Sequence, residues 1–519
     1  MIPIEESGCL DIVTGTVTGY NHEGMGVLRQ ERQVVFVPGA LSGEEVSVRL
    51  DSRKKGGAMW GELIDIRKPS PYRRVPPCPN YSRCGGCQLQ HASYGHQLQV
   101  KQEILARALA PLRKQGIPIQ TLIMPVIPAP APTGYRNKGV FAVSRAAGAA
   151  DAAPAGGAVA IGFYGRKSRE VAGHGCPTLF SARVNALLDD LALWLGRYGA
   201  VQTPSHIMIR ESGADGKVIL VLIGEKEPPW LPAFLDAFMP RPGGKSPDSL
   251  PRRGGQLAGA GWLASADKEG AIAGQKPLTL RGSLDIAEHY RRDPPIRFTI
   301  SPESFFQVNS AQGERLCAEA EKACGLTGEE ILWDMYCGAG TIGLYLASRA
   351  KAVLGMDAGA SAIRDAWANA RGNAAATAPP LHGRVCFLAG AAEDLAPSLL
   401  GCPALLPGML KGQESLYTAP SGRVYPPHKA LVRLLSEKAP DAVILDPPSK
   451  GAKPAVLQAI RAAAPRRVVY VSCDPATLSR DLQILAGGAL YALEKVQPVD
   501  MFPQTAHVEA VASLRRCGS

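Results

Sequence analysis

A cysteine directly after one predicted strand and a glutamate inside another could together perform covalent chemistry. Cys473 follows the apolar run RVVYVS and precedes a predicted helix, whose N-terminus would favour a thiolate. Glu509 lies in the apolar run HVEAVASL, where burial would raise the pKa of its carboxyl toward that of a general base. An inert buried thiol and a glutamate in a salt bridge are the alternatives, and neither residue alone decides between the interpretations.

A second group of residues could bind a nucleoside cofactor where other predicted strands end. In ILWDMYCGAGTIG the apolar run ends at Tyr336, and Gly338 and Gly340 permit close approach of the backbone to a ligand. Asp357 ends the next strand about twenty residues later, where it could bind ribose hydroxyls. Asp446 in LDPPSKG precedes two prolines, a stiff turn that would hold a carboxylate beside cofactor and substrate. A dinucleotide site, a helix cap at Asp357 and a purely structural proline turn are the alternatives.

Three cysteines lie close together in a segment rich in proline and glycine. Cys78, Cys84 and Cys87 give the spacing C-x5-C-x2-C in PPCPNYSRCGGCQLQH. Twelve cysteines in 519 residues are too dilute for a small disulfide-stapled domain. Thiols grouped in this way suggest coordination of a metal, with free structural thiols as the alternative.

The elements that position these residues begin with short alternating strands. Residues 1–70 show strands separated by turns, the pattern of a small antiparallel barrel. Residues 71–300 contain the cysteine segment, a predicted helix near 93–115 and several predicted strands. Two stretches in this region, 145–158 and 241–261, are rich in Gly, Ala and Pro and are predicted to be flexible insertions.

The pattern changes in the last part of the chain. From 301 to 519, predicted helices alternate with short apolar runs, which indicates a mostly parallel sheet with helices on both faces. Ligands bind such sheets beyond the carboxyl ends of the strands, where Tyr336, Asp357 and Asp446 fall. The sequence therefore predicts one binding crevice for these three residues.

Composition favours a polyanionic partner. Lys and Arg number 57 against 46 Asp and Glu, a formal net charge of +11. Nucleic acid is the leading candidate, and a merely basic enzyme is the alternative. No run approaches the roughly 18 to 20 consecutive apolar residues of a membrane span, and the N-terminus lacks a signal-peptide pattern. We expect a cytoplasmic protein without membrane attachment.

Five blocks of the chain, in order, resemble the RNA (uracil-5-)-methyltransferase family. They are SPESFFQVN at 301–309, DMYCGAGTIGL, LDPPSKG, YVSCDPATLSRDL and DMFPQTAHVE. The resemblance implies an α/β fold with a Rossmann-like class I methyltransferase domain. It also implies an N-terminal OB-fold barrel of the TRAM type, and a β-rich central domain that carries an iron–sulfur site. The expected reaction is methyl transfer from S-adenosyl-L-methionine to C5 of a uridine in RNA.

The resemblance assigns roles to individual residues. Uracil C5 is too poor a nucleophile to take a methyl group unaided, so a thiolate first adds at C6, a role that falls to Cys473. Glu509 becomes the base that removes the C5 proton. The residues expected to contact S-adenosyl-L-methionine are Gln307, Tyr336, Asp357 and Asp446.

The same resemblance implies a [4Fe-4S] cluster in the cysteine segment. Cys176 in HGCPT would be the fourth ligand, beside Cys78, Cys84 and Cys87. Zinc stays the alternative, disfavoured because zinc sites more often use paired C-x2-C hooks. The cluster would staple the fold and shape an RNA-binding surface.

The layout of barrel and cluster resembles that of the 23S rRNA enzymes of the family. The resemblance therefore implies 23S rRNA as the substrate, with tRNA as the alternative. It implies no obligate protein partner. A non-catalytic RNA-binding or assembly protein and a nicotinamide oxidoreductase are the other interpretations. Intact Cys473, Glu509 and Gln307 argue against the first, and the Asp-Pro-Pro turn argues against the second. The chain departs from the family pattern at Ser449 and Ala391, and residues 400–430 match no family segment.

Overall fold

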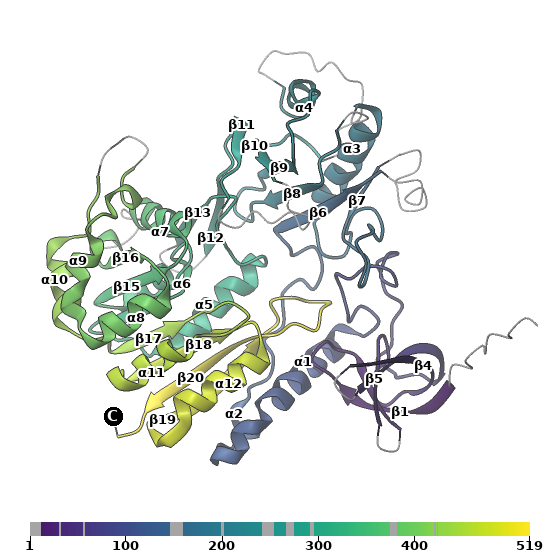
Figure 1. The fold of residues 1–519 in the computed structure, drawn as a ribbon, viewed down its shortest axis with the longest axis horizontal. Helices are drawn as coiled ribbons and strands as arrows, with labels where there is room; N and C mark the ends of the chain where they lie inside the picture. Colours follow the sequence, from purple (N-terminus) through teal and green to yellow (C-terminus); the bar gives the residue numbers. More distant parts are fainter. Residues whose placement is uncertain are drawn as a thin grey trace, which may run out of the picture.

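The computed structural model describes residues 12–518 apart from 31–32, 56–57, 146–158, 199–201, 241–253, 266–274, 291–294, 374–380, 420–421 and 423. Most of the two predicted flexible insertions therefore lies outside the described residues. Within them, a closed barrel, a six-stranded sheet, a two-stranded ribbon and a seven-stranded sheet follow one another along the chain (Figure 1). No described helix is long and apolar enough to span a bilayer.

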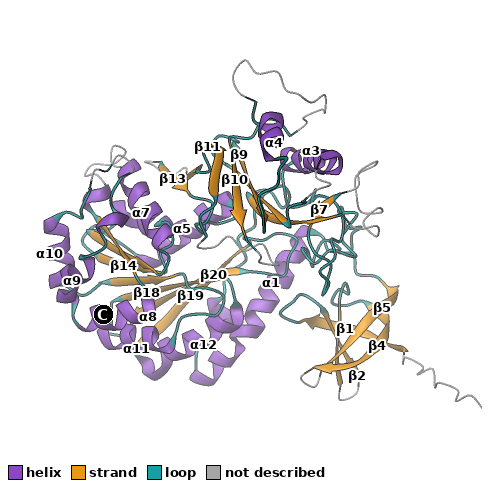
Figure 2. Ribbon diagram, turned by 45° about the horizontal axis from the view of Figure 1, so that its top comes forward, coloured by secondary structure: helices purple, strands orange, loops and turns teal. Residues whose placement is uncertain are grey.

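The N-terminal strands close into the predicted barrel, in the order β1-β2-β3-β5-β4. The strands are β1 (Ile12–Tyr20), β2 (Gly26–Gln30), β3 (Gln33–Val37), β4 (Glu45–Lys55) and β5 (Ala58–Lys68). Val17, Leu28, Val35 and Val48 fill its interior and are almost fully buried. Figure 2 shows the barrel beside the rest of the molecule.

The middle of the chain builds a six-stranded sheet in the order β11-β10-β9-β8-β6-β7. Its strands are β6 (Lys138–Ser144), β7 (Ala160–Gly162), β8 (His206–Glu211), β9 (Val218–Gly224), β10 (Gly259–Ala264) and β11 (Leu278–Gly282). Helices α3 (Ala182–Tyr198) and α4 (Leu231–Phe238) pack on it through a core that includes Trp194 and Phe234. The two-stranded ribbon is β12 (Ile286–Tyr290) and β13 (Ile296–Ile300).

The C-terminal part is the predicted, mostly parallel sheet, in the order β16-β15-β14-β17-β18-β20-β19. Its strands are β14 (Ile331–Met335), β15 (Ala352–Asp357), β16 (Val385–Ala389), β17 (Ala442–Leu445), β18 (Arg467–Ser472), β19 (Tyr491–Val499) and β20 (Glu509–Arg516). β14 to β18 are parallel, and β20 pairs antiparallel with both β18 and β19. The direction of winding reverses between β14 and β17, so the binding crevice is expected beyond their carboxyl ends.

Helices cover both faces of this sheet, as predicted. One face carries α5 (Ser310–Cys324), α6 (Thr341–Leu346) and α7 (Ala360–Gly372), and the other carries α8 (Ala392–Gly401), α11 (Pro454–Ala463) and α12 (Pro475–Ala486) (Figures 1 and 2). The helix expected near 93–115 is α1 (Tyr94–Leu109) followed by a 3-10 turn, and it packs against α12. A short α2 (Ile119–Leu122) contacts β19.

The segment 400–430, which matched no family pattern, covers the edge of the sheet. It forms α9 (Leu406–Leu410) between short 3-10 turns and leads into α10 (Lys429–Glu437). The side chain of Gln413 accepts a hydrogen bond from the backbone N–H of Ala389 and donates one to its carbonyl, both at 2.9 Å. Gln413 thus occupies the backbone N–H and carbonyl of Ala389 at the edge of β16. Unpaired groups at a sheet edge could otherwise pair with another strand.

Candidate active site

The antiparallel pairing of β18 with β20 brings Cys473 and Glu509 together. Ser472, the last residue of β18, pairs with Ala510 of β20. One step further along this register, Cys473 faces Glu509, and the charge of Glu509 acts on the Cys473 thiol. The two residues are 36 positions apart in the sequence and meet because the chain returns antiparallel through the hairpin of β19 and β20.

Glu509 has the environment expected of a general base. Its side chain is 4% exposed, and no hydrogen bond or ion pair joins it to another described residue. Burial raises the pKa of Glu509 to about 8, and the nearby Asp446 adds to the rise. The predicted rise in the pKa of Glu509 is confirmed. The alternative of a salt bridge is not supported, because Glu509 has no ion-pair partner in the described part of the chain.

Cys473 does not show the thiolate character that the sequence suggested. Its side chain is half-buried, and burial together with the charges of Glu509 and Asp446 raises the pKa of Cys473 to about 12. The helix N-terminus is satisfied by Asp474, whose carboxylate accepts a hydrogen bond from the backbone N–H of Thr477 at 2.7 Å. Burial and the two carboxylates therefore act against the thiolate that the sequence predicts at this helix N-terminus.

One cavity joins three of the four predicted cofactor residues. Gln307, Tyr336 and Asp446 line it, together with Gly338 of the turn after β14. Asp357 is not part of this lining. Its carboxylate accepts hydrogen bonds from the backbone N–H groups of Gly338 at 3.0 Å and Gly359 at 2.7 Å, so it supports the turn.

The turn after β14 has an unusual backbone. Tyr336 has a φ of 65°, and Gly338 and Gly340 have φ of 55° and 79°. Glycine adopts this left-handed region freely, whereas a tyrosine there is strained. Such strain persists where surrounding contacts enforce it, and it concentrates at ligand sites. Hydrogen bonds from Cys337 N–H to the Met356 carbonyl and from Gly338 to Asp357 hold the turn in place.

Sequence reasoning missed Asp334, which lies inside β14 and also lines the cofactor cavity. Asp334 is fully buried; one carboxylate oxygen accepts from the Gly343 N–H at 2.7 Å, and the other has no partner among the described residues. Burial raises the pKa of Asp334 to about 8 and that of Asp446 to about 7. An aspartate in the middle of the apolar run ILWDM was the signal that could have found it.

These carboxyls give the cavity its electrostatic character. The charges that raise the pKa of Asp334 and of Asp446 are those of other aspartates. A buried carboxyl without a cation costs free energy when it ionises. The cavity therefore suits a ligand that brings its own positive charge.

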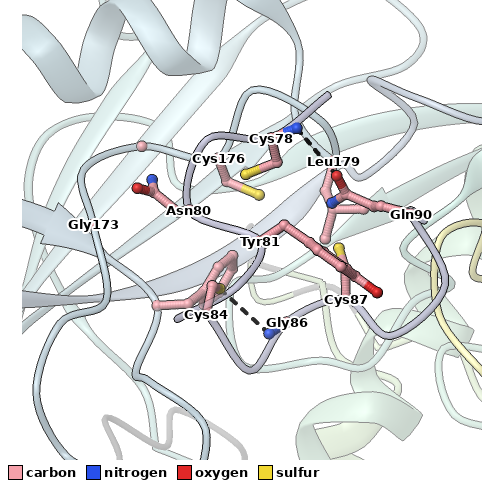
Figure 3. A pocket seen from close by; sticks show the side chains of 12 residues that line it. Cys78, Asn80, Tyr81, Cys84, Gly86, Cys87, Gln90, Gly173, Cys176 and Leu179 are labelled. Atoms are coloured by element: carbon pink, nitrogen blue, oxygen red, sulfur yellow. Dashed lines mark hydrogen bonds between the residues drawn. The ribbon is translucent and has the colours of Figure 1, made fainter. Parts of the chain in front are cut away.

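The four predicted cysteine ligands line a second cavity (Figure 3). Cys78, Cys84 and Cys87 come from the loop before α1, and Cys176 comes from the segment between β7 and α3. Two hydrogen bonds hold the loop. The backbone N–H of Cys78 donates to the Gln90 side chain at 3.2 Å, and the backbone N–H of Gly86 donates to the Cys84 sulfur at 3.3 Å. Among the described residues, no three His, Cys, Asp or Glu side chains are arranged to hold a metal ion. The structure thus groups the thiols, and a bound cluster is not shown.

A doubly wound sheet with a glycine-bearing turn, and an acidic cavity at its switch point, define the class of α/β methyltransferases. The family model for tRNA (uracil-5-)-methyltransferases matches residues 431–517. An uncharacterized RNA methyltransferase of Clostridium acetobutylicum is 32% identical over 525 residues, which cover 99% of each chain. Another, of Staphylococcus aureus, is 31% identical over 97% of each chain. The chain therefore belongs to the RNA (uracil-5-)-methyltransferase family and is an S-adenosylmethionine-dependent RNA methyltransferase.

A solved structure supports the fold. The tRNA (uracil-54, C5)-methyltransferase of Pyrococcus abyssi, crystallised in complex with S-adenosyl-L-homocysteine, superposes with a TM-score of 0.65 at 24% sequence identity. The match covers 96% of this chain and 99% of the Pyrococcus chain. The likeness thus extends over the N-terminal barrel, the middle sheet and the C-terminal sheet together.

Proposed function

We propose that this enzyme methylates C5 of a uridine in 23S rRNA through a covalent adduct between Cys473 and C6 of the base. The observation that carries the mechanism is the pairing of Cys473 with Glu509 where β18 ends and β20 begins. The family supplies the reaction, and this pair supplies a nucleophile and a base for it.

In the proposed reaction, the Cys473 sulfur bonds to C6, and the electron pair of the C5–C6 double bond moves onto the ring as an enolate. C5 then takes the methyl group, and S-adenosyl-L-homocysteine is the neutral leaving group. Glu509 removes the C5 proton, the C6–sulfur bond breaks, and the double bond and the thiolate are restored. The target uridine must leave its RNA stack for this geometry, at a cost of a few kcal/mol.

The acidic cavity explains how a thiol with a raised pKa can react. We place S-adenosyl-L-methionine beside Gln307, Tyr336 and Asp446, with Asp357 and Asp334 supporting the turn. A positive sulfonium there offsets the carboxylates that now raise the pKa of Cys473. The nucleophile is therefore expected to ionise when the methyl donor is bound.

We also propose that Cys78, Cys84, Cys87 and Cys176 hold a [4Fe-4S] cluster. The four thiols line one cavity, and they form the all-cysteine donor set that such clusters use. A cluster attaches each thiolate to a different iron, so its ligands lie further apart than around one zinc ion. When bound, the cluster would tie the loop before α1 to Cys176, and methyl transfer needs no electron from it.

The substrate proposal rests on the layout of the chain. A barrel in residues 1–70, a cysteine-bearing middle region in 71–300 and a methyltransferase region in 301–519 would let RNA contact all three parts, with a cytoplasmic location. Transfer RNA is the second candidate, because the Pyrococcus abyssi enzyme with the same fold is named as a tRNA methyltransferase.

Anaerobically purified enzyme incubated with labelled methyl donor and separate pools of ribosomal and transfer RNA tests the proposal. We expect 5-methyluridine in 23S rRNA, and methylation of tRNA alone would overturn the substrate. Cys473→Ser should abolish the product, whereas Cys402→Ser should retain it, because Cys402 is an exposed free thiol. Undiminished 5-methyluridine from a folded Cys473→Ser variant would overturn the mechanism.

A further inference from the structure

Residues 500–508 lead into Glu509, the proposed general base. They are held by residues from near the start of the chain. Gln504 lies at its centre, 6% exposed and with a φ of 71°. The Gln504 carbonyl accepts hydrogen bonds from the backbone N–H groups of Gln88 at 3.1 Å and Leu89 at 2.9 Å. Gln88 directly follows Cys87, so the cysteine loop contacts this stretch through its own backbone.

Side chains extend this contact. The Gln97 carboxamide accepts from the Gln504 N–H at 3.0 Å and donates to the Gln504 side-chain oxygen at 3.0 Å. The Gln504 side chain donates to the Pro132 carbonyl at 3.1 Å. The Gln88 side chain accepts from the backbone N–H of Ala506 at 3.4 Å, three residues before Glu509.

The beginning of the same stretch is fixed by a buried ion pair. Lys101 of α1 pairs with Asp500, and both side chains are fully buried. Lys101 also donates to the Phe502 carbonyl at 2.9 Å, and the Tyr94 hydroxyl donates to Asp500 at 2.8 Å. Residues 500–506 therefore have anchors at both ends, and both ends receive contacts from the cysteine loop or from α1.

This arrangement matters because the Glu509 side chain has no hydrogen-bond partner among the described residues. Its carboxylate is placed by its backbone alone, through β20 on one side and residues 500–508 on the other. A displacement of about 1 Å in such a group can cost about 100-fold in rate. Changes at the contacts on Gln504 can therefore move Glu509 without touching substrate.

We propose that Gln97 and the Gln88–Leu89 backbone are positioning residues for Glu509, and that they make removal of the C5 proton depend on an intact four-cysteine site. The inference rests on the proposed function. A change at Cys87 displaces the N–H groups of Gln88 and Leu89, and Gln504 follows them. The early steps, in which Cys473 bonds to C6 and C5 takes the methyl group, do not use Glu509 and continue. A loosened cysteine loop therefore stops the reaction at the methylated covalent adduct.

The test compares Gln97→Met and Gln504→Met with Gln99→Met. Methionine keeps the volume of glutamine and removes its hydrogen bonds, and Gln99 is an exposed glutamine of the same helix whose side chain hydrogen-bonds to His96. We expect resolution of the covalent adduct, and with it release of methylated RNA, to slow by about 10- to 100-fold in Gln97→Met and Gln504→Met. Methylated protein–RNA adduct should accumulate on denaturing gels, while cofactor affinity and the KM for RNA stay within about threefold of wild type. Gln99→Met should behave as wild type.

Equal loss of adduct formation and of turnover in Gln97→Met would overturn the proposal, because it would indicate general damage to the fold. Wild-type turnover in Gln97→Met would overturn it as well. A wild-type enzyme that makes no 5-methyluridine would instead refute the proposed function, so the two failures are distinguishable.

Hydrogen exchange supplies a readout that does not depend on activity. After anaerobic chelation of iron from the wild-type protein, peptides covering 500–508 should exchange faster, whereas peptides of β14 and β15 should not change. Gln97→Met should show the faster exchange before chelation and little further increase after it. Unchanged exchange of 500–508 on iron removal would overturn the link to the cysteine site.

Discussion

Cys473 and Glu509 face each other across β18 and β20, one step beyond the pairing of Ser472 with Ala510. Residues opposite one another in antiparallel strands have Cα atoms roughly 5 Å apart and point to the same face of the sheet, so both side chains can reach one bound nucleobase. The nucleophile must reach C6 and the base must reach the hydrogen on C5, which is the neighbouring ring carbon. The closeness of Cys473 and Glu509 therefore fits the closeness of C6 and C5, the two ring atoms on which they act.

Glu509→Gln should trap a covalent protein–RNA complex. Glutamine keeps the size of the side chain but cannot take the C5 proton, so the methylated adduct with Cys473 cannot resolve. We expect a denaturation-resistant band that carries label from the methyl donor, and turnover lower by at least about 100-fold. Glu494→Gln, a change on neighbouring β19 in a surface ion-pair network, should form no such band. A folded Glu509→Gln enzyme that releases methylated RNA at the wild-type rate would remove Glu509 from its assigned role.

The rate of adduct resolution should rise with pH and level off above about pH 8. Glu509 can accept a proton only when it is ionised, and burial raises its pKa to about 8. Once the methyl group has left, the cofactor is neutral, so no positive charge counters this shift. Asp446→Asn removes the charge that adds to the shift, and the midpoint should move to lower pH. Rapid-quench single-turnover measurements at saturating cofactor and RNA would follow the step, and a flat profile between pH 6 and pH 9 would contradict the assignment.

Patterns local in sequence predicted much of the fold and the site. Apolar runs that end in Tyr336, Asp446 or Cys473 mark the strand ends of a parallel sheet, and ligands bind at those ends. The direction of the pKa shift at Cys473 was not predictable, because it depends on burial in the folded protein and on two carboxylates brought in by distant strands. Asp334 was missed because its significance lies in one oxygen that faces the cavity without a partner.

Other features could not come from strand patterns at all. The grouping of Cys176 with the loop before α1 depends on a contact between segments about ninety residues apart, and only the family resemblance supplied it. The bonds from Gly338 and Gly359 to Asp357 depend on how the turn closes. Residues 400–430 gave no recognisable pattern, although Leu406, Leu410, Leu416 and Tyr417 are buried in the main hydrophobic core and Gln413 bonds to β16.

Asp334→Asn should stabilise the empty enzyme at alkaline pH. The folded-state pKa of Asp334 is about 8 against an ordinary value of 3.8, so only the unfolded chain releases this proton between those pH values. Stability from this group is therefore lost as pH rises from about 4 to about 8. Asparagine cannot ionise and can still accept the Gly343 hydrogen bond, so we expect a Tm higher by roughly 5 to 10 °C at pH 8.5 and by a clearly smaller amount at pH 5.

Thermal unfolding at both pH values, with and without cofactor, measures this effect. Bound S-adenosyl-L-methionine should narrow the gap between wild type and Asp334→Asn at pH 8.5, because its positive charge favours the ionised carboxylate. The neutral product S-adenosyl-L-homocysteine should narrow it less. An equal Tm difference at pH 5 and pH 8.5 would show that Asp334 does not titrate in this range.

Cys87→Ser should lower the iron content of the protein while leaving the methyltransferase sheet folded. Serine is a poor ligand for iron, and Cys87 lines the cavity shared with Cys78, Cys84 and Cys176. We expect about four irons per wild-type chain, with broad absorbance near about 400 nm, and a loss of most of both in the variant. Cys402→Ser, which changes an exposed thiol outside that cavity, is the matched control and should keep its iron. Stoichiometric zinc with no visible absorbance in anaerobically purified wild-type protein would replace the cluster by a single-ion site.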